Sequence, residues 1–338
     1  AEARLRVDRI AQVLVGDLAL VPGNRVLLRG GNSIGMALVM LAVMKAGLVA
    51  VATMPLLRSK ELGDIIDKAQ PVAALCDVAL LAELETAQAQ HPVLARILAF
   101  NTRESDSQTD ALDALAADKH GAFTACATAA TDIALLAFTS GTTGQPKAAV
   151  HTHRDVMAAC QTWPRHVLGA SPDDVVMGSP PLAFTFGLGG LLVFPMWAGA
   201  SVYYPDIPYS PEGMARLMFD IGATICYTAP TFYRQMAPHL QALIAECERQ
   251  AGAAPRDPSA AASEIAEVHA AWLERWLPKL EADTVPLNPY RVLWELQRTV
   301  DVAQTIITHD AGSPRDQLSP FWKTTEPLSY LGWGKSTQ

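Results

Sequence analysis

Short apolar runs alternate with longer stretches of helical periodicity through the first part of the chain. Apolar runs within 25–29, 48–53 and 72–76 predict buried strands, and the intervening stretches 34–46 and 58–69 predict helices. Parallel strands that are buried on both faces give continuous apolar runs of this kind. The pattern therefore predicts an α/β fold with mostly parallel sheets flanked by helices.

The longest apolar stretch covers residues 34–57 and is interrupted by Lys45, Gly47 and Pro55. A membrane helix needs about 20 nearly uninterrupted apolar residues. We therefore expect a buried helix followed by a buried strand, and no membrane segment. Residues 4–16 have the periodicity of an amphipathic helix rather than of a signal peptide, and the chain begins without Met, as if cut from a longer one.

A further apolar run, 133–138, predicts a strand that leads directly into a stretch rich in glycine and threonine. A second short strand is expected at 148–150. Thr152 follows it and can cap the next helix, with Asp155 three residues on.

The character of the chain changes after Leu240. Residues 249–263 are rich in Ala, Pro and Ser and predict a linker or an exposed turn. Residues 264–277 predict an amphipathic helix that carries Trp272 and Trp276. Another helix is expected after Pro289, followed by a strand at 305–308.

The stretch 139–147, Thr-Ser-Gly-Thr-Thr-Gly-Gln-Pro-Lys, is the strongest chemical signal in the sequence. Its two glycines allow a sharp turn and a close approach to a ligand. Successive backbone N–H groups in such a turn can hold an anion, four hydroxyls add donors, and the lysine adds a positive charge. A triphosphate fits these groups. The alternative is a flexible surface loop, but linkers of this composition rarely lie between two buried strands.

This stretch, preceded by Leu136, resembles the signature of the adenylate-forming superfamily, which includes acyl-CoA and aryl-CoA synthetases, although Ala148 stands where a Gly is usual. The resemblance implies that the loop binds the β- and γ-phosphates of ATP. It makes Lys147 and Thr142 the candidate catalytic residues. The expected cofactor-binding residues are Thr139, Ser140, Gly141, Thr142, Thr143, Gly144 and Lys147.

Further motifs resemble benzoate-CoA and 2-aminobenzoate-CoA ligases. Residues 180–190, Pro-Pro-Leu-Ala-Phe-Thr-Phe-Gly-Leu-Gly-Gly, resemble the segment with which the superfamily binds its acyl substrate, and 227–231 resemble the next motif beside that pocket. The resemblance spans about residues 4–240 and implies a pocket for an aromatic carboxylate. The expected pocket residues are Phe184, Gly187, Tyr227, Thr228, Ala229 and Pro230.

Some side chains in these motifs have plainer interpretations. Phe184 and Phe186 are of a type that usually belongs to the core. Their place in the motif favours pocket lining for Phe184 and leaves Phe186 evenly balanced. His151 and His153 are close to Lys147, but no carboxylate or cysteine cluster accompanies them, so we expect no metal site there.

The superfamily motifs that supply the Mg²⁺ ligand, the ribose contact and the adenylation lysine are not found downstream of Thr231. Residues 241–338 resemble instead part of a thiamine-diphosphate enzyme of the acetolactate synthase type, at 286–294, 306–312 and 331–338. We therefore expect a partial AMP-binding (adenylation) domain at 1–240, then a helical linker and a partial α/β thiamine-diphosphate-type domain within 241–338. A deletion fusion, a pseudogene product or an assembly artefact would each give such a junction near Leu240.

The net charge and the cysteine spacing argue against a nucleic-acid-binding protein and against a disulfide-linked one. The formal net charge is −8, and no Lys/Arg run is present, which argues against nucleic acid as a partner. The five cysteines show no paired spacing, as expected of reduced thiols in a cytoplasmic protein.

Three functions follow as hypotheses. The first is an aromatic-acid CoA ligase that uses ATP, Mg²⁺ and CoA, with little turnover because motifs are missing. The second is a thiamine-diphosphate-dependent lyase or synthase, and the third is a non-catalytic remnant that binds nucleotide.

Overall fold

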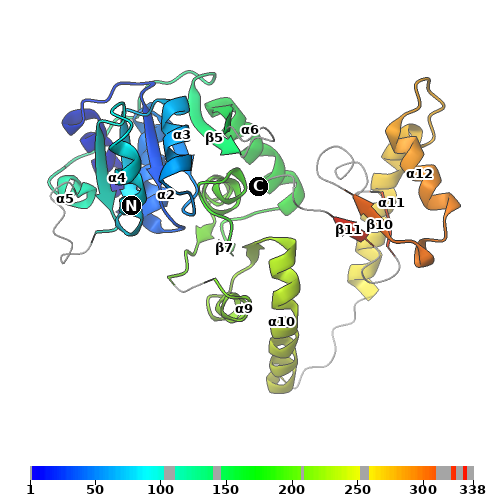
Figure 1. The fold of residues 1–338 in the computed structure, drawn as a ribbon. Coiled ribbons are helices and arrows are strands. Elements are labelled where there is room, and N and C mark those ends of the chain that lie inside the picture. The colour runs from blue at the N-terminus through cyan, green and yellow to red at the C-terminus, as the bar shows by residue number, and fades with distance from the viewer. Residues whose placement is uncertain are drawn as a thin grey trace. The chain divides into compact units, whose positions relative to one another are not determined.

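The computed structural model describes residues 2–102, 111–139, 146–206, 209–251, 259–309, 321–324 and 330–332. The chain divides into two compact units, Ala1–Gln250 and Ala251–Gln338 (Figure 1). The predicted boundary residue, Leu240, lies inside the long helix α10 (Pro230–Ala251). The position of the domain boundary stays a prediction.

A mostly parallel sheet forms the centre of the first unit, as predicted (Figure 1). Its strand order is β4-β3-β1-β2-β5-β6, and every neighbouring pair is parallel except β5 and β6. Its strands are β1 (Arg25–Arg29), β2 (Val49–Thr53), β3 (Ala73–Asp77), β4 (Arg96–Phe100), β5 (Ile133–Thr139) and β6 (Lys147–Thr152).

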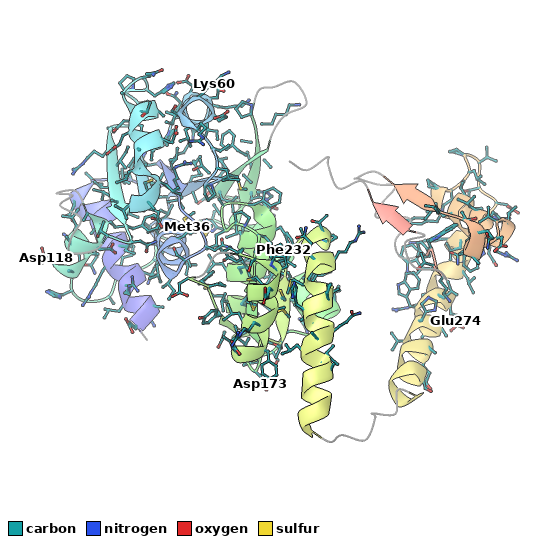
Figure 2. The ribbon with its side chains drawn as sticks, turned by 60° about the horizontal axis from the view of Figure 1, so that its bottom comes forward. Met36, Lys60, Asp118, Asp173, Phe232 and Glu274 are labelled. Atoms are coloured by element: carbon teal, nitrogen blue, oxygen red, sulfur yellow. The ribbon has the colours of Figure 1, made fainter. Side chains whose placement is uncertain are left out.

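Helices connect these strands. The predicted apolar helix is α2 (Ile34–Lys45), which is buried along most of its length, and all five residues of the following strand β2 are buried. Figure 2 labels Met36 of α2, which has no exposed surface. The other helical segments here are α1 (Glu2–Gln12), η1 (Val13–Asp17), α3 (Ser59–Ala69), η2 (Val78–Leu80), α4 (Leu81–Gln88) and α5 (Leu112–Ala117).

A second, smaller parallel sheet completes the first unit. Its order is β8-β7-β9, built from β7 (Val175–Gly178), β8 (Ser201–Val202) and β9 (Ile225–Tyr227). The helical segments around it are α6 (His153–Trp163), η3 (Pro164–Leu168), α7 (Thr185–Leu188), η4 (Gly189–Val193), α8 (Phe194–Ala198), α9 (Pro211–Asp220) and α10. Figure 2 labels Phe232, near the start of α10, which packs against the small core of Met177, Met214 and Met236.

Local signals in the sequence account for several helix ends. The Ser33 hydroxyl accepts a hydrogen bond from Met36 N (3.1 Å) at the start of α2. At α6 the predicted cap is confirmed, because Thr152 Oγ1 accepts from Asp155 N (3.2 Å) and Thr152 N donates to the Asp155 carboxylate (2.8 Å). Such reciprocal caps satisfy backbone N–H groups that have no partner inside the helix.

The second unit contains α11 (Ser259–Leu280), α12 (Pro289–Thr299), η5 (Val302–Gln304) and a parallel pair of strands, β10 (Ile307–His309) and β11 (Tyr330–Gly332). The predicted helix with two tryptophans is α11. Trp276 packs edge-on against Tyr290 of α12, with 5.3 Å between ring centroids, and Trp272 stacks on Phe321 at 5.1 Å. The predicted linker at 249–263 overlaps both neighbouring helices, since α10 extends to Ala251 and α11 begins at Ser259.

Arg29, the last residue of β1, is buried with 1% of its surface exposed. Within the described residues, its guanidinium donates to four backbone carbonyls, those of Leu80 (3.3 Å), Met54 (3.1 Å), Pro55 (3.1 Å) and Leu57 (2.8 Å). Desolvation lowers its pKa from the ordinary value, and nearby Cys76 and Glu83 oppose that shift. One side chain thus ties the segments after β2 and β3 to the end of β1.

Replacement of Arg29 by Ala is expected to lower the free energy of unfolding by about 3–5 kcal/mol, because four carbonyls would each lose a donor. Arg25→Ala is the matched control, since its exposed side chain donates to one carbonyl, Ala69 O (2.7 Å), and should cost about 1 kcal/mol. Urea unfolding followed by circular dichroism measures both. Equal losses would contradict the anchoring role of Arg29.

Candidate functional site

The predicted phosphate loop connects two antiparallel strands at the edge of the larger sheet. Thr139, the last residue of β5, pairs with Lys147, the first residue of β6. β5 is parallel to β2, so the loop begins at the carboxyl end of a parallel strand. Ligands of open α/β sheets bind at that end. The loop residues 140–145 lie outside the described part of the chain, and with them the predicted Ser140, Gly141, Thr142, Thr143 and Gly144.

Lys147 is exposed at the start of β6, and no described carboxylate forms an ion pair with its ammonium. His151 lies in β6 and His153 begins α6. Within the described residues, no three His, Cys, Asp or Glu side chains gather in a group able to hold a metal ion. Among the described residues of this edge, the ammonium of Lys147 is therefore a charge that has no carboxylate partner.

The residues predicted to line the acid pocket lie around the carboxyl ends of β7 and β9 in the smaller sheet. These strands are parallel, with Gly178 opposite Tyr227. Ser179 N donates to Tyr227 O (2.9 Å), and the hydroxyls of Ser179 and Thr228 are hydrogen-bonded to each other. Thr228 is buried, whereas Ala229 and Pro230 are exposed at the start of α10.

The aromatic side chains of the two predicted motifs meet beside this sheet. Phe184 is half-buried and precedes α7, and Phe186 on α7 is 44% exposed. The Phe186 ring meets the Tyr227 ring edge-on, with 6.0 Å between centroids and 87° between planes. Such contacts between aromatic rings are favourable beyond the area that they bury. The structure thus brings both motifs together through Phe186, the residue that sequence reasoning left undecided.

Two glycines allow the close packing of this pocket segment. A Cβ on Gly187 would lie 2.0 Å from Pro181 O, and a Cβ on Gly190 would lie 2.7 Å from the Tyr227 ring. Real Cβ atoms do not approach so closely, so both positions require glycine for space. Gly187, a predicted pocket residue, is therefore required here for close packing against the backbone at Pro181.

The Tyr227 hydroxyl is buried and makes no hydrogen bond within the described residues. Burial raises the pKa of Tyr227, and the Trp163 indole lies close enough to offset part of that shift. The phenol is therefore neutral at physiological pH. A neutral, half-buried aromatic residue suits the ring of an aromatic acid better than its carboxylate.

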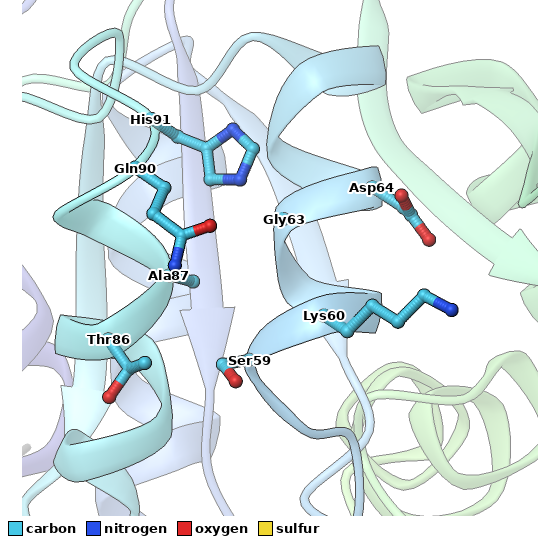
Figure 3. A pocket seen from close by; sticks show the side chains of 8 residues that line it. All are labelled: Ser59, Lys60, Gly63, Asp64, Thr86, Ala87, Gln90 and His91. Atoms are coloured by element: carbon cyan, nitrogen blue, oxygen red, sulfur yellow. The ribbon is translucent and has the colours of Figure 1, made fainter.

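A polar pocket of about 280 Å³ lies elsewhere, between α3 and α4 (Figure 3). His91 projects toward Gly63 there, and its Nδ1 is 2.7 Å from the Asp67 carboxylate. The lining residues are Ser59, Lys60, Gly63, Asp64, Thr86, Ala87, Gln90 and His91. None of them belongs to the predicted site.

Sequence reasoning did not predict the role of Asn32. This residue follows β1, and its side-chain amide contacts Pro180 and Leu182 in the segment after β7. The signal that was available is its place directly after a buried parallel strand, where site residues gather. The sequence alone does not disclose partners that are so distant along the chain.

Comparisons with known proteins match the whole of the first unit, and the family profile continues into the second. The sequence profile of the family described as AMP-binding enzyme matches residues 1–284. The benzoate–CoA ligase of Thauera aromatica is 29% identical over 235 residues, which are 70% of this chain and 44% of that protein. The anthranilate–CoA ligase of Pseudomonas aeruginosa is 28% identical over 67% of this chain and 43% of its own length.

Solved structures of CoA ligases are also similar to this chain. The anthranilate CoA ligase AuaEII in complex with anthranoyl-AMP has a TM-score of 0.64 and 27% identity, covering 68% of this chain and 44% of its own. ATP-bound MatB from Rhodopseudomonas palustris has a TM-score of 0.61 and 27% identity. The match covers 70% of this chain and 44% of the MatB chain. The chain thus spans less than half the length of these relatives.

Replacement of Gly187 by Ala is expected to lower the free energy of unfolding by about 1–3 kcal/mol, because the new methyl group collides with a backbone carbonyl. Gly16→Ala is the control, since a Cβ at Gly16 meets no atom within 4 Å. It should leave stability unchanged or slightly raised. Urea unfolding of both variants tests this expectation, and a Gly187 variant as stable as the parent would contradict the packing described.

Proposed function

Because the chain belongs to the family of AMP-binding enzymes, we propose that its first unit binds ATP and an aromatic carboxylate, as part of an aromatic-acid CoA ligase. The observation that carries the proposal is the pairing of Thr139 with Lys147 at the carboxyl end of β5. The two ends of the predicted phosphate loop therefore lie at the carboxyl end of a parallel strand, the end at which ligands of open α/β sheets bind.

The predicted membership of the adenylate-forming superfamily and the predicted α/β fold with a mostly parallel sheet are confirmed. Enzymes of this family use ATP, Mg²⁺ and CoA, and the named relatives are CoA ligases for benzoate and anthranilate. For this chain we infer an aromatic acid from the rings of Phe184, Phe186 and Tyr227, which offer an apolar, neutral surface.

The proposed reaction has two steps. The carboxylate oxygen of the acid attacks the α-phosphorus of ATP, the bond to the bridging oxygen breaks, and pyrophosphate leaves. The CoA thiolate then attacks the acyl carbon and AMP leaves. Lys147 and the loop donors, including Thr142, would stabilise the negative charge of the leaving phosphates, as fixed donors do in a preorganised site.

The described side chains can be compared with what ATP, Mg²⁺ and thiamine diphosphate require. An exposed ammonium with no described carboxylate partner fits the phosphates of ATP. Among the described residues, no three His, Cys, Asp or Glu side chains form a group able to hold a metal ion, and the reaction is derived without a step on Mg²⁺. Thiamine diphosphate stays a prediction for residues 241–338, of which the AMP-binding profile includes those up to 284.

Lys147→Gln is expected to weaken ATP binding about tenfold, because a charge-assisted contact to phosphate is lost. The control is Lys60→Gln, another surface lysine, which lines the pocket between α3 and α4. Isothermal titration of the pure chain with ATP measures both. Equal affinities for the parent and the Lys147 variant, or a loss confined to the Lys60 variant, would contradict the placement of ATP at the β5–β6 loop.

ATP–pyrophosphate exchange with benzoate or 2-aminobenzoate is expected to be slow for the chain as given. The reason is that the motifs expected to supply the Mg²⁺ ligand, the ribose contact and the adenylation lysine are not found downstream of Thr231. Binding of ATP is nevertheless expected to raise the unfolding temperature of the chain. Exchange at the rate of a full-length ligase would contradict this expectation. Stabilisation by thiamine diphosphate, with none by ATP, would instead favour the thiamine-diphosphate hypothesis.

A further inference from the structure

The side-chain amide of Asn32 joins two segments that are far apart in the sequence. Asn32 lies in the turn between β1 and α2, at the carboxyl end of the larger sheet. Its Nδ2 donates to Pro180 O (2.9 Å), and its Oδ1 accepts from Leu182 N (2.7 Å). The amide therefore contacts the backbone on both sides of Pro181, which has no N–H of its own.

The turn 180–182 supports the residues of the proposed acid pocket. Phe184 N donates to Pro181 O (2.9 Å), and Leu188 N donates to Phe184 O (2.8 Å), so α7 begins on this turn. Gly187 rests against the same carbonyl, to which a Cβ would come within 2.0 Å. A displacement of the turn would therefore move both Phe184 and Gly187.

A primary amide is the side-chain group that suits these two contacts. It carries a donor and an acceptor at a fixed separation, whereas an ionised carboxylate only accepts. An aspartate at this position would present a negative charge to the Pro180 carbonyl. The titratable group beside Asn32 is Tyr209, whose pKa is raised by burial, an effect that Asn32 partly offsets. Tyr209 is therefore neutral at physiological pH.

We propose that Asn32 is a positioning residue for the acid pocket, and that its amide holds the turn 180–182 in the place that Phe184 and Gly187 need to receive an aromatic ring. This inference rests on the proposed function for its ligand, and it adds a residue from the larger sheet to a pocket formed by the smaller one. Asn32 itself touches backbone and is assigned no contact with the acid.

The first experiment measures positioning without any ligand. Hydrogen exchange of the whole chain is followed at the amides of Phe184 and Leu188, whose acceptors are backbone carbonyls and not Asn32. Asn32→Ala is expected to raise both exchange rates at least about tenfold, because the turn loses two hydrogen bonds. Asn24→Ala is the control, since Asn24 Oδ1 accepts only from the nearby Val21 N (3.0 Å). Unchanged rates in the Asn32 variant would overturn the proposal, whether or not the chain binds an acid.

The second experiment measures binding of 2-aminobenzoate, through its own fluorescence, to the parent chain and to Asn32→Asp. At about pH 8 the variant is expected to bind the acid about tenfold more weakly, with ATP affinity changed less than about twofold. As the pH is lowered from about 8, the ratio of the variant's Kd to the parent's Kd at the same pH is expected to fall, because a growing fraction of the carboxyl is protonated and regains a donor for Pro180 O.

The outcomes separate the two proposals. Parallel losses of acid and ATP affinity with no recovery at low pH would show a merely structural role and overturn the inference. Failure of the parent chain to bind 2-aminobenzoate would count against the proposed function instead, and the exchange rates would still decide the role of Asn32.

Discussion

The turn 180–182 lacks enough backbone N–H donors to pair with its own carbonyl groups. The candidate site depends on the donors that other segments supply to these carbonyls. Pro180 and Pro181 supply carbonyl groups but no N–H donors. Buried carbonyls that lack partners cost free energy, so donors must come from elsewhere. Asn32 supplies one for Pro180 O, and Phe184 N supplies one for Pro181 O. The same contacts connect the smaller sheet to the larger one and fix the start of α7.

Residues at and just after the carboxyl end of β1 make hydrogen bonds to loops that follow strands of both sheets. Arg29 donates to carbonyls of the segments after β2 and β3, and Asn32 contacts the segment after β7. β1 lies in the middle of the larger sheet, between β3 and β2. A central strand is a stable reference, because its backbone groups are bonded on both sides. Polar side chains at its carboxyl end can therefore position several loops at once.

The fold was predictable to the extent that it depends on local patterns. Apolar runs revealed β1, β2 and β3 because these strands are buried on both faces, and Thr152 revealed the start of α6 because a cap acts over three residues. The strand order was not predictable, since it depends on packing between distant segments. The contacts of Asn32 were not predictable for the same reason, because its two partners are 148 and 150 positions away in the sequence. Phe186 could not be decided because its contact with Tyr227 is also a tertiary one.

The two sheets offer different chemistry to the proposed ligands, ATP and an aromatic acid. The edge of the larger sheet presents the ammonium of Lys147, whereas the smaller sheet presents the rings of Phe184, Phe186 and Tyr227, without a charged group among them. An aromatic acid reacting with ATP has an apolar ring at one end and a charged reacting group at the other. The polar pocket between α3 and α4 lacks such a division, because its lining combines Lys60, Asp64 and His91 with no aromatic ring besides the imidazole. Burying a benzene ring there would displace water from polar groups without replacing their hydrogen bonds, so the strand ends are the better site for an aromatic substrate.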